Sequence, residues 1–149
     1  SIVHRPSSVI DVGCGSGILS IAAVKLGAGH VRARDLDPAV LSEISHNLGL
    51  NEIPSGTVDL EEGNLLDGMD ETVDLLMANI IIEPLLEMLP NVPARLKEKG
   101  RALFSGLLVK ERERFCAALE ATGLRVIDEL SLGDWWGVTV EPYAAPSRR

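Results

Sequence analysis

The chain is poor in the residues on which several classes of small protein depend. Only two cysteines, Cys14 and Cys116, occur in 149 residues, which excludes a disulfide framework and a zinc ribbon. No stretch approaches the roughly 18 consecutive apolar residues of a membrane span. The opening residues also lack the pattern of a secretory signal. We therefore expect a cytoplasmic protein with no membrane partner.

Basic residues are scarce as well. The chain carries 14 Lys and Arg against 22 Asp and Glu, a net charge of −8. Because proteins that bind phosphate backbones usually have the opposite balance, no direct nucleic-acid partner is expected. An acidic surface would suit a basic partner, although it also serves solubility. The three histidines, His4, His30 and His46, are scattered without metal-ligand spacing, so no metal site is expected.

Length and composition fit one globular domain over residues 1–149. Short β-branched runs alternate with stretches of helical period. Strands are predicted at 8–12, 31–36, 57–60, 73–78, 102–105, 124–130 and 138–140. Helices are predicted at 18–26, from Pro38 to Gly49, from Glu83 onward and at 109–122. The third helix should bend or split at Pro90 and Pro93, and 138–140 is expected to be an edge strand or a hairpin partner.

This alternation predicts an α/β fold, a mostly parallel sheet with helices on both faces. Ligands of such sheets bind at the carboxyl ends of the strands, so the residues at that rim are the candidates for function.

The first rim segment is a glycine turn between a strand and a helix, with glycines at 13, 15 and 17. Glycines allow positive φ and let a ligand touch the backbone, and the helix that follows directs amide N–H groups at the ligand. The turn alone could also be only a tight connection.

Asp35 strengthens the interpretation of the turn as a ligand site, because it follows Gly13 by 22 residues. A carboxylate at about this spacing accepts hydrogen bonds from a ribose diol; otherwise Asp35 is a solvated loop acid. We assign Asp37 to the cap of the next helix. Asp11 could hold an ammonium group, directly or through water, or it could be satisfied within the turn.

The spacing of the glycines also distinguishes between classes of ligand. The dinucleotide-binding fingerprint has Gly or Ala at the position of residue 18, where this chain has Ile18. A nicotinamide-dependent oxidoreductase is therefore disfavoured. A nucleoside with a charged amino-acid end and no phosphate fits better.

Several segments occur in the same order as in a known family. They are residues 11–23 (DVGCGSGILSIAA), 35–38 (DLDP) and 78–85 (ANIIIEPL), followed by the closing stretch 123–138. Together they resemble the bacterial ribosomal protein L11 methyltransferase family. Members are class I enzymes that use S-adenosyl-L-methionine to methylate amino groups, such as lysine side chains, of a ribosomal protein of the large subunit.

The resemblance implies a Rossmann-like three-layer sandwich with a seven-stranded, mostly parallel sheet whose last strand is antiparallel. It also implies that Gly13 lies against the cofactor and that Asp35 holds its ribose. Asp11 and Gly15 of the same turn are the further residues that we expect to bind the cofactor. Family members carry an amino-terminal substrate-recognition domain that would precede Ser1, so we expect that domain to be absent here. Arg34 departs from the smaller or aliphatic residues that are commoner at its position in the family.

Asn64, Leu65 and Asn79 complete the implied cofactor site. Asn64 and Leu65 match the segment that frames adenine, and Asn79 would lie beside the methyl group. Asn79 is also the expected catalytic residue, because its side-chain oxygen and the carbonyl of Ile80 could accept hydrogen bonds from an incoming amine. The alternative is that Asn79 caps the helix at Pro84.

Two questions stay open. Trp135 and Trp136 are expected to pack the final hairpin, although they could form an aromatic wall for an alkylammonium chain. The chain could also bind cofactor without completing catalysis, or act on another substrate.

Overall fold

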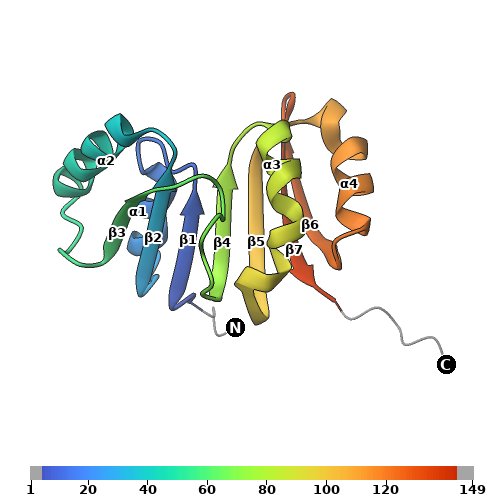
Figure 1. The fold of residues 1–149 in the computed structure, drawn as a ribbon. Helices are drawn as coiled ribbons and strands as arrows, with labels where there is room; N and C mark the ends of the chain where they lie inside the picture. The colour runs from blue at the N-terminus through green and yellow to red at the C-terminus, as the bar shows by residue number, and fades with distance from the viewer. Residues whose placement is uncertain (1–4, 144–149) are drawn as a thin grey trace.

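The computed structural model describes residues 5–143, which form one seven-stranded sheet in the order β3-β2-β1-β4-β5-β7-β6 (Figure 1). β1 to β6 run parallel, and β7 is antiparallel to both of its neighbours. The strands are β1 (Ser8–Val12), β2 (His30–Asp35), β3 (Val58–Glu62), β4 (Val73–Asn79), β5 (Leu96–Leu108), β6 (Leu124–Leu132) and β7 (Trp135–Pro142). The predicted sheet with an antiparallel last strand is confirmed.

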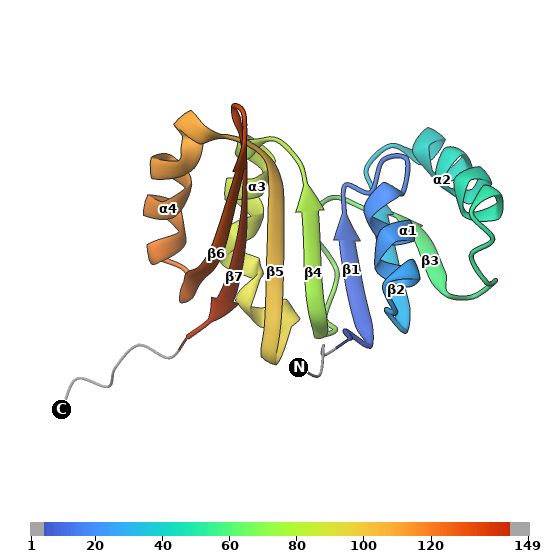
Figure 2. The same cartoon turned by 180° about the vertical axis from the view of Figure 1, so that it is seen from behind.

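Helices cover both faces of the sheet. α1 (Ile18–Lys25) lies over one face, and α3 (Ile82–Met88) and α4 (Arg112–Glu120) lie over the other (Figures 1 and 2). α2 (Pro38–Leu50) lies on the same face as α1, since Val58 of β3 packs against the apolar clusters beneath both helices. Figure 2 shows that α1 covers only the β1 side of its face, so β5 and β7 have no helix in front of them. No helix in residues 5–143 is long and apolar enough to cross a membrane.

The alternation of side chains along β1 explains the two layers. Val9 packs beneath α1, whereas Ile10 and Val12 belong to the larger core beneath α3 and α4. In that larger core, Phe115 of α4 contacts Phe104 of β5 edge-on, with ring centroids 5.9 Å apart. A strand with both faces buried is rich in β-branched apolar residues, and Val9, Ile10 and Val12 are why residues 8–12 could be identified as a strand from sequence.

Of the two alternatives for 138–140, the edge strand is wrong and the hairpin partner is right. β7 lies between β5 and β6, and β6 forms the edge, because the β6–β7 hairpin inserts its second strand next to β5. The hairpin itself is confirmed. β5 is much longer than the predicted 102–105. Pro90 and Pro93 do end α3: two single 3₁₀ turns, Leu89–Asn91 and Pro93–Arg95, follow it.

Arg34 is a buried charged residue that is held by an ion pair and a hydrogen bond. It is buried on β2, where its Nε lies 3.0 Å from Oε1 of Glu61 on β3. Its Nη2 also donates to the carbonyl of Asp67 at 3.0 Å. The loop after β3 is thereby fixed across the sheet near the rim, which explains why a charged residue is tolerated at this buried position.

Candidate functional site

The glycine turn is held in place from two neighbouring elements. The N–H of Cys14 donates to the carbonyl of Arg34 on β2 at 2.9 Å. Nδ2 of Asn47 on α2 donates to the carbonyl of Ser16 at 2.8 Å. Gly13 and Gly15 have φ of 68° and 51°, a region that side chains other than glycine rarely adopt. The turn is therefore preformed at the end of β1.

Asp35 faces this turn. The N–H of Gly15 donates to Oδ2 of Asp35 at 3.1 Å, and the N–H of Asp37 donates to Oδ1 at 3.0 Å. Two backbone donors thus fix the orientation of the carboxylate, which keeps further acceptor capacity on both oxygens. Asp37 instead accepts from the N–H of Ala39 at 2.9 Å and is the N-cap of α2, so its assignment as the cap is confirmed.

Asp11 lies beneath the turn and is almost completely buried. Its Oδ2 accepts a hydrogen bond from Oγ of Ser20 on α1 at 2.6 Å. Burial raises the pKa of the Asp11 carboxyl to about 6, although the bonds from Ser20 oppose the shift. Burial, with the nearby carboxylates of Asp11 and Asp35, also raises the pKa of the Cys14 thiol to about 12. The turn is thus a site of negative potential with an unreactive thiol.

The segment after β3 reaches the same rim. The N–H of Gly63 donates to the carbonyl of Asp35 at 3.0 Å, which places Asn64 and Leu65 next to the end of β2. Leu65 adopts φ of 49° and packs against the main core, while exposed Asn64 donates to Asp67 at 3.3 Å. The structure therefore brings both residues close to Asp35, as the adenine-framing hypothesis requires.

Asn79 ends β4 beside the glycine turn. The side chain of the next residue, Ile80, lies against Gly13: a Cβ at Gly13 would come within 2.7 Å of Cγ2 of Ile80. Asn79 is exposed, and it does not cap the following helix, because the N-cap of α3 is Ile81 with no side-chain cap. The alternative that Asn79 is a helix cap is wrong.

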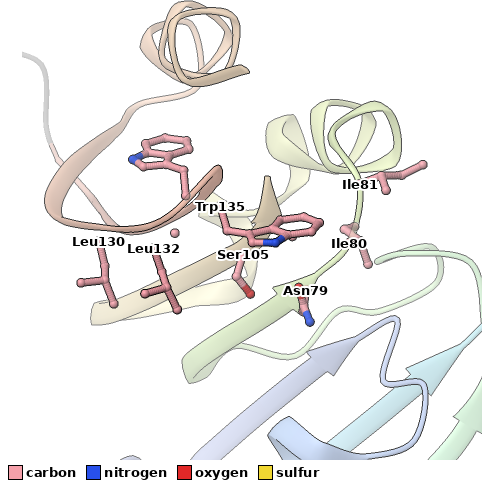
Figure 3. Close-up of a pocket in the computed structure, with 10 residues that line it drawn as sticks. Asn79, Ile80, Ile81, Ser105, Leu130, Leu132 and Trp135 are labelled. Atoms are coloured by element: carbon pink, nitrogen blue, oxygen red, sulfur yellow. The ribbon is translucent and has the colours of Figure 1, made fainter. Parts of the chain in front are cut away.

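An open cavity of about 600 Å³ adjoins Asn79 (Figure 3). Asn79 and Ser105 project to the same side of the sheet from β4 and β5, and Leu130 and Leu132 do so from β6. Trp135 lines this cavity and is 58% exposed, whereas Trp136 is buried against Phe115 with ring centroids 5.4 Å apart. Only Trp136 packs the hairpin as expected, so the two tryptophans differ in role.

Sequence reasoning missed three residues at this rim. Ser20 contacts Asp11, and Ser105 and Gly106 line the cavity beside Asn79. A signal for the last two existed, since Ser105–Gly106 ends a predicted strand at the same sheet edge as Asn79. Ser20 had no comparable signal, because its contact depends on how α1 packs. Residues 5–143 contain no group of three or more His, Cys, Asp or Glu side chains that could hold a metal ion.

The sheet order, the turn after β1 and the acid after β2 define the class I S-adenosylmethionine-dependent methyltransferase fold. A TehB-like SAM-dependent methyltransferase from Corynebacterium glutamicum has this fold at 19% identity, with a TM-score of 0.74 over 95% of this chain and 83% of that one. At that identity the likeness concerns the fold alone.

Sequence comparison identifies one family within this fold class. The model of the ribosomal protein L11 methyltransferase family matches residues 1–142, and the chain belongs to that family. It is 38% identical to the ribosomal protein L11 methyltransferase of Lactobacillus johnsonii over 91% of this chain. It is 33% identical to a ribosomal protein L11 methylase from Lactobacillus delbrueckii subsp. bulgaricus, with a TM-score of 0.90 over 97% of this chain and 73% of that one. The chain spans only 42% of the length of the first relative.

Proposed function

We propose that residues 1–149 form the cofactor-binding and methyl-transferring domain of a protein-lysine N-methyltransferase. The cofactor is S-adenosyl-L-methionine, and the substrate is a ribosomal protein of the large subunit. The observation that carries the proposal is the hydrogen bond from Gly15 to Asp35, because it joins the glycine turn to a fixed carboxylate at one rim. Since the matched relatives are longer, the proposal concerns the cofactor and transfer site rather than substrate recognition.

The charge of the turn supports a cationic ligand. Asp11 and Asp35 both lie close enough to the turn to affect the thiol of Cys14. A sulfonium compound with an ammonium group suits this potential better than a pyrophosphate does. The amide of Gly15 is also already engaged by Asp35, which leaves one donor fewer for a phosphate. In the proposal Asp35 holds the ribose, Asp11 favours the ammonium end through the electric field, and Asn64 and Leu65 frame the adenine.

Methyl transfer from a sulfonium requires no general acid from the protein, because the leaving group is neutral. When bound, S-adenosyl-L-methionine supplies an electrophilic methyl group on a sulfonium that leaves as a neutral thioether. A lysine amine has a reference pKa near 10.4, so freeing its lone pair at neutral pH costs roughly 4 kcal/mol. In the proposal Oδ1 of Asn79 and the carbonyl of Ile80 accept hydrogen bonds from the amine and orient its lone pair. Orientation of this kind supplies roughly 7–11 kcal/mol.

Calorimetry with the 149-residue chain tests the cofactor assignment. We expect one saturable site for S-adenosyl-L-methionine and for its demethylated product S-adenosyl-L-homocysteine, and no heat with NAD. Heat with NAD and none with the sulfonium compound would overturn the proposal.

A second measurement separates an active domain from one that only binds. Radiolabelled S-adenosyl-L-methionine is incubated with the chain and with purified ribosomal protein L11, the substrate named for the relatives. We expect label on lysine. Cofactor binding without transfer would instead favour a domain that needs further parts of the longer relatives for turnover.

A further inference from the structure

β5 carries an irregularity directly beside Asn79. Its pairing with β7 shifts register between Phe104 and Leu107, and Gly106 within this bulge has φ of 81°. A bulge re-aims side chains and bends the strand locally. It comes at the end of the strand that lies next to β4.

Gly106 matters here because of what a side chain would meet. A Cβ at this position would lie 2.7 Å from Oδ1 of Asn79 and 2.8 Å from the carbonyl oxygen of Ile80. These are the two oxygens to which the proposed function assigns the amine. Any residue larger than glycine would cover both of them, so Gly106 keeps them open to the cavity.

Ser105, the residue before Gly106, pairs with the same segment of β4. It is the register partner of Asn79, and its carbonyl accepts the N–H of Ile80 at 3.2 Å. Its side chain lines the cavity, and within residues 5–143 its hydroxyl has no hydrogen-bond partner. Three oxygens thus belong to residues that line the cavity: Oδ1 of Asn79, the carbonyl of Ile80 and Oγ of Ser105.

The rest of the lining is apolar. No residue that lines this cavity carries a charge, and the walls include Leu130, Leu132 and Trp135. An amine in such surroundings loses solvation, which favours its neutral form, while its N–H groups still require acceptors. A carboxylate or a phosphate would find no cation there. The combination of apolar walls and three oxygens therefore suits an aliphatic primary amine.

We propose that the Ser105–Gly106 bulge completes an amine-binding site, in which Gly106 leaves the oxygens of Asn79 and Ile80 uncovered and Ser105 offers a third acceptor. The inference rests on the proposed function and extends it to two further residues. Ser105 is a substrate-contacting residue in this scheme, and Gly106 determines access to the site.

A titration monitored by nuclear magnetic resonance tests the inference without relying on turnover. The ¹⁵N-labelled chain is titrated with n-butylamine, an analogue of the lysine side chain, with and without S-adenosyl-L-homocysteine. We expect the backbone amide of Gly106 and the side-chain amide of Asn79 to shift. n-Butyltrimethylammonium, which has the same chain but no N–H donor, should bind at least about tenfold more weakly.

Three variants locate the site. Gly106→Ala should weaken butylamine binding by about tenfold or more, because the added methyl group covers two acceptors. Ser105→Ala should weaken it by about threefold to tenfold, the scale of one neutral hydrogen bond. Gly123→Ala is the matched control, because Gly123 also has positive φ but nothing within 4 Å of its added Cβ; its affinity should be unchanged. Should Gly106→Ala fail to fold in a thermal melt, Ser105→Ala remains the test.

The outcomes separate this inference from the proposed function. Shifts at Gly15 on addition of S-adenosyl-L-homocysteine, with no response to butylamine at Asn79 or Gly106, would overturn the amine site and leave the cofactor site standing. Equal binding of butylamine and its trimethylated analogue would overturn it too. Failure of S-adenosyl-L-homocysteine to bind would count against the proposed function itself.

Discussion

Ser20 on α1 donates a 2.6 Å hydrogen bond to the buried carboxylate of Asp11 on β1. This contact ties the first strand to the helix on the far side of the glycine turn. It only partly offsets the loss of solvation at Asp11, since the pKa of that carboxyl is still raised to about 6. A buried group with a raised pKa makes stability depend on pH.

Asp11→Asn should stabilise the domain at neutral pH. The folded state binds the proton of Asp11 more tightly than the unfolded state does, so stability from this group is complete below about pH 4 and is lost as pH rises through 6. Asn keeps the acceptor for Ser20 without the charge. In urea titrations the variant should exceed the parent by about 2–3 kcal/mol at pH 7.5 and by little at pH 4.

Asp70→Asn is the matched control, because it makes the same change of carboxylate to amide at an exposed position. A stability gain for Asp11→Asn of equal size at both pH values would contradict the assignment. If Asp11 also attracts the ammonium end of the cofactor, the stabilised variant should bind S-adenosyl-L-methionine more weakly.

Substitutions of Asp35 and Asp37 should have different effects, the first on the affinity for the cofactor and the second on the free energy of unfolding. Asp35→Ala removes the carboxylate that faces the turn, and we expect affinity for S-adenosyl-L-homocysteine to fall by about 10-fold to 100-fold. Asp37→Ala removes the cap of α2, which should cost about 1 kcal/mol of stability with little change in affinity. Calorimetry and urea titration measure the two effects. Equal losses of affinity in both variants would show that Asp35 has no special role.

Gly13 and Ile80 should be coupled. Gly13→Ala combines a φ of 68° with a collision 2.7 Å from Cγ2 of Ile80, so we expect a loss of about 2–3 kcal/mol in unfolding free energy. Gly15→Ala has the same kind of strain but open space, and should cost about 1–2 kcal/mol. In an Ile80→Ala background the excess cost at Gly13 should vanish, which a double-mutant cycle measures. Strict additivity would rule out the contact.

Truncation of the two tryptophans should change the free energy of unfolding by very different amounts. Trp136→Ala removes a buried ring that contacts Phe115 and donates through Nε1 to Glu129 at 3.1 Å, so it should cost about 3–5 kcal/mol. Trp135→Ala should change stability by less than about 1 kcal/mol, because that side chain is mostly exposed. Chemical denaturation followed by far-ultraviolet circular dichroism compares them. A costly Trp135→Ala would mean that Trp135 is part of the core.

Strands with both faces buried were the most predictable part of the fold. Residues 8–12 and 73–78 are short, mainly apolar segments that each contain one aspartate, and the structure has strands there. The order of β6 and β7 was not predictable, because alternation within a hairpin does not say which of its strands joins the existing sheet. The length of β5 was hidden by its charged first half, where Lys97, Glu98 and Lys99 are exposed.

The residues of the candidate site also fall into a group that the sequence predicted and a group that it did not. The glycines of the turn, Asp35 and Asn79 could be singled out because parallel strands bring their carboxyl ends to one rim. The approach of Ser20 to Asp11, and of Gly106 to Asn79, could not be predicted, since each depends on packing between segments that no local pattern relates.

The sequence alone determined the succession of strands and helices, the glycine turn at residues 13–17 and the family, because these depend on local periodicity and on the order of motifs. Only the tertiary structure decided which atoms meet. It buries Asp11 beneath α1, leaves Trp135 exposed while Trp136 is buried, and brings Gly106 of the β5 bulge against Asn79 and Ile80. Such contacts form when segments that are distant in sequence pack together and exclude water, and the local sequence of either segment does not specify its partner.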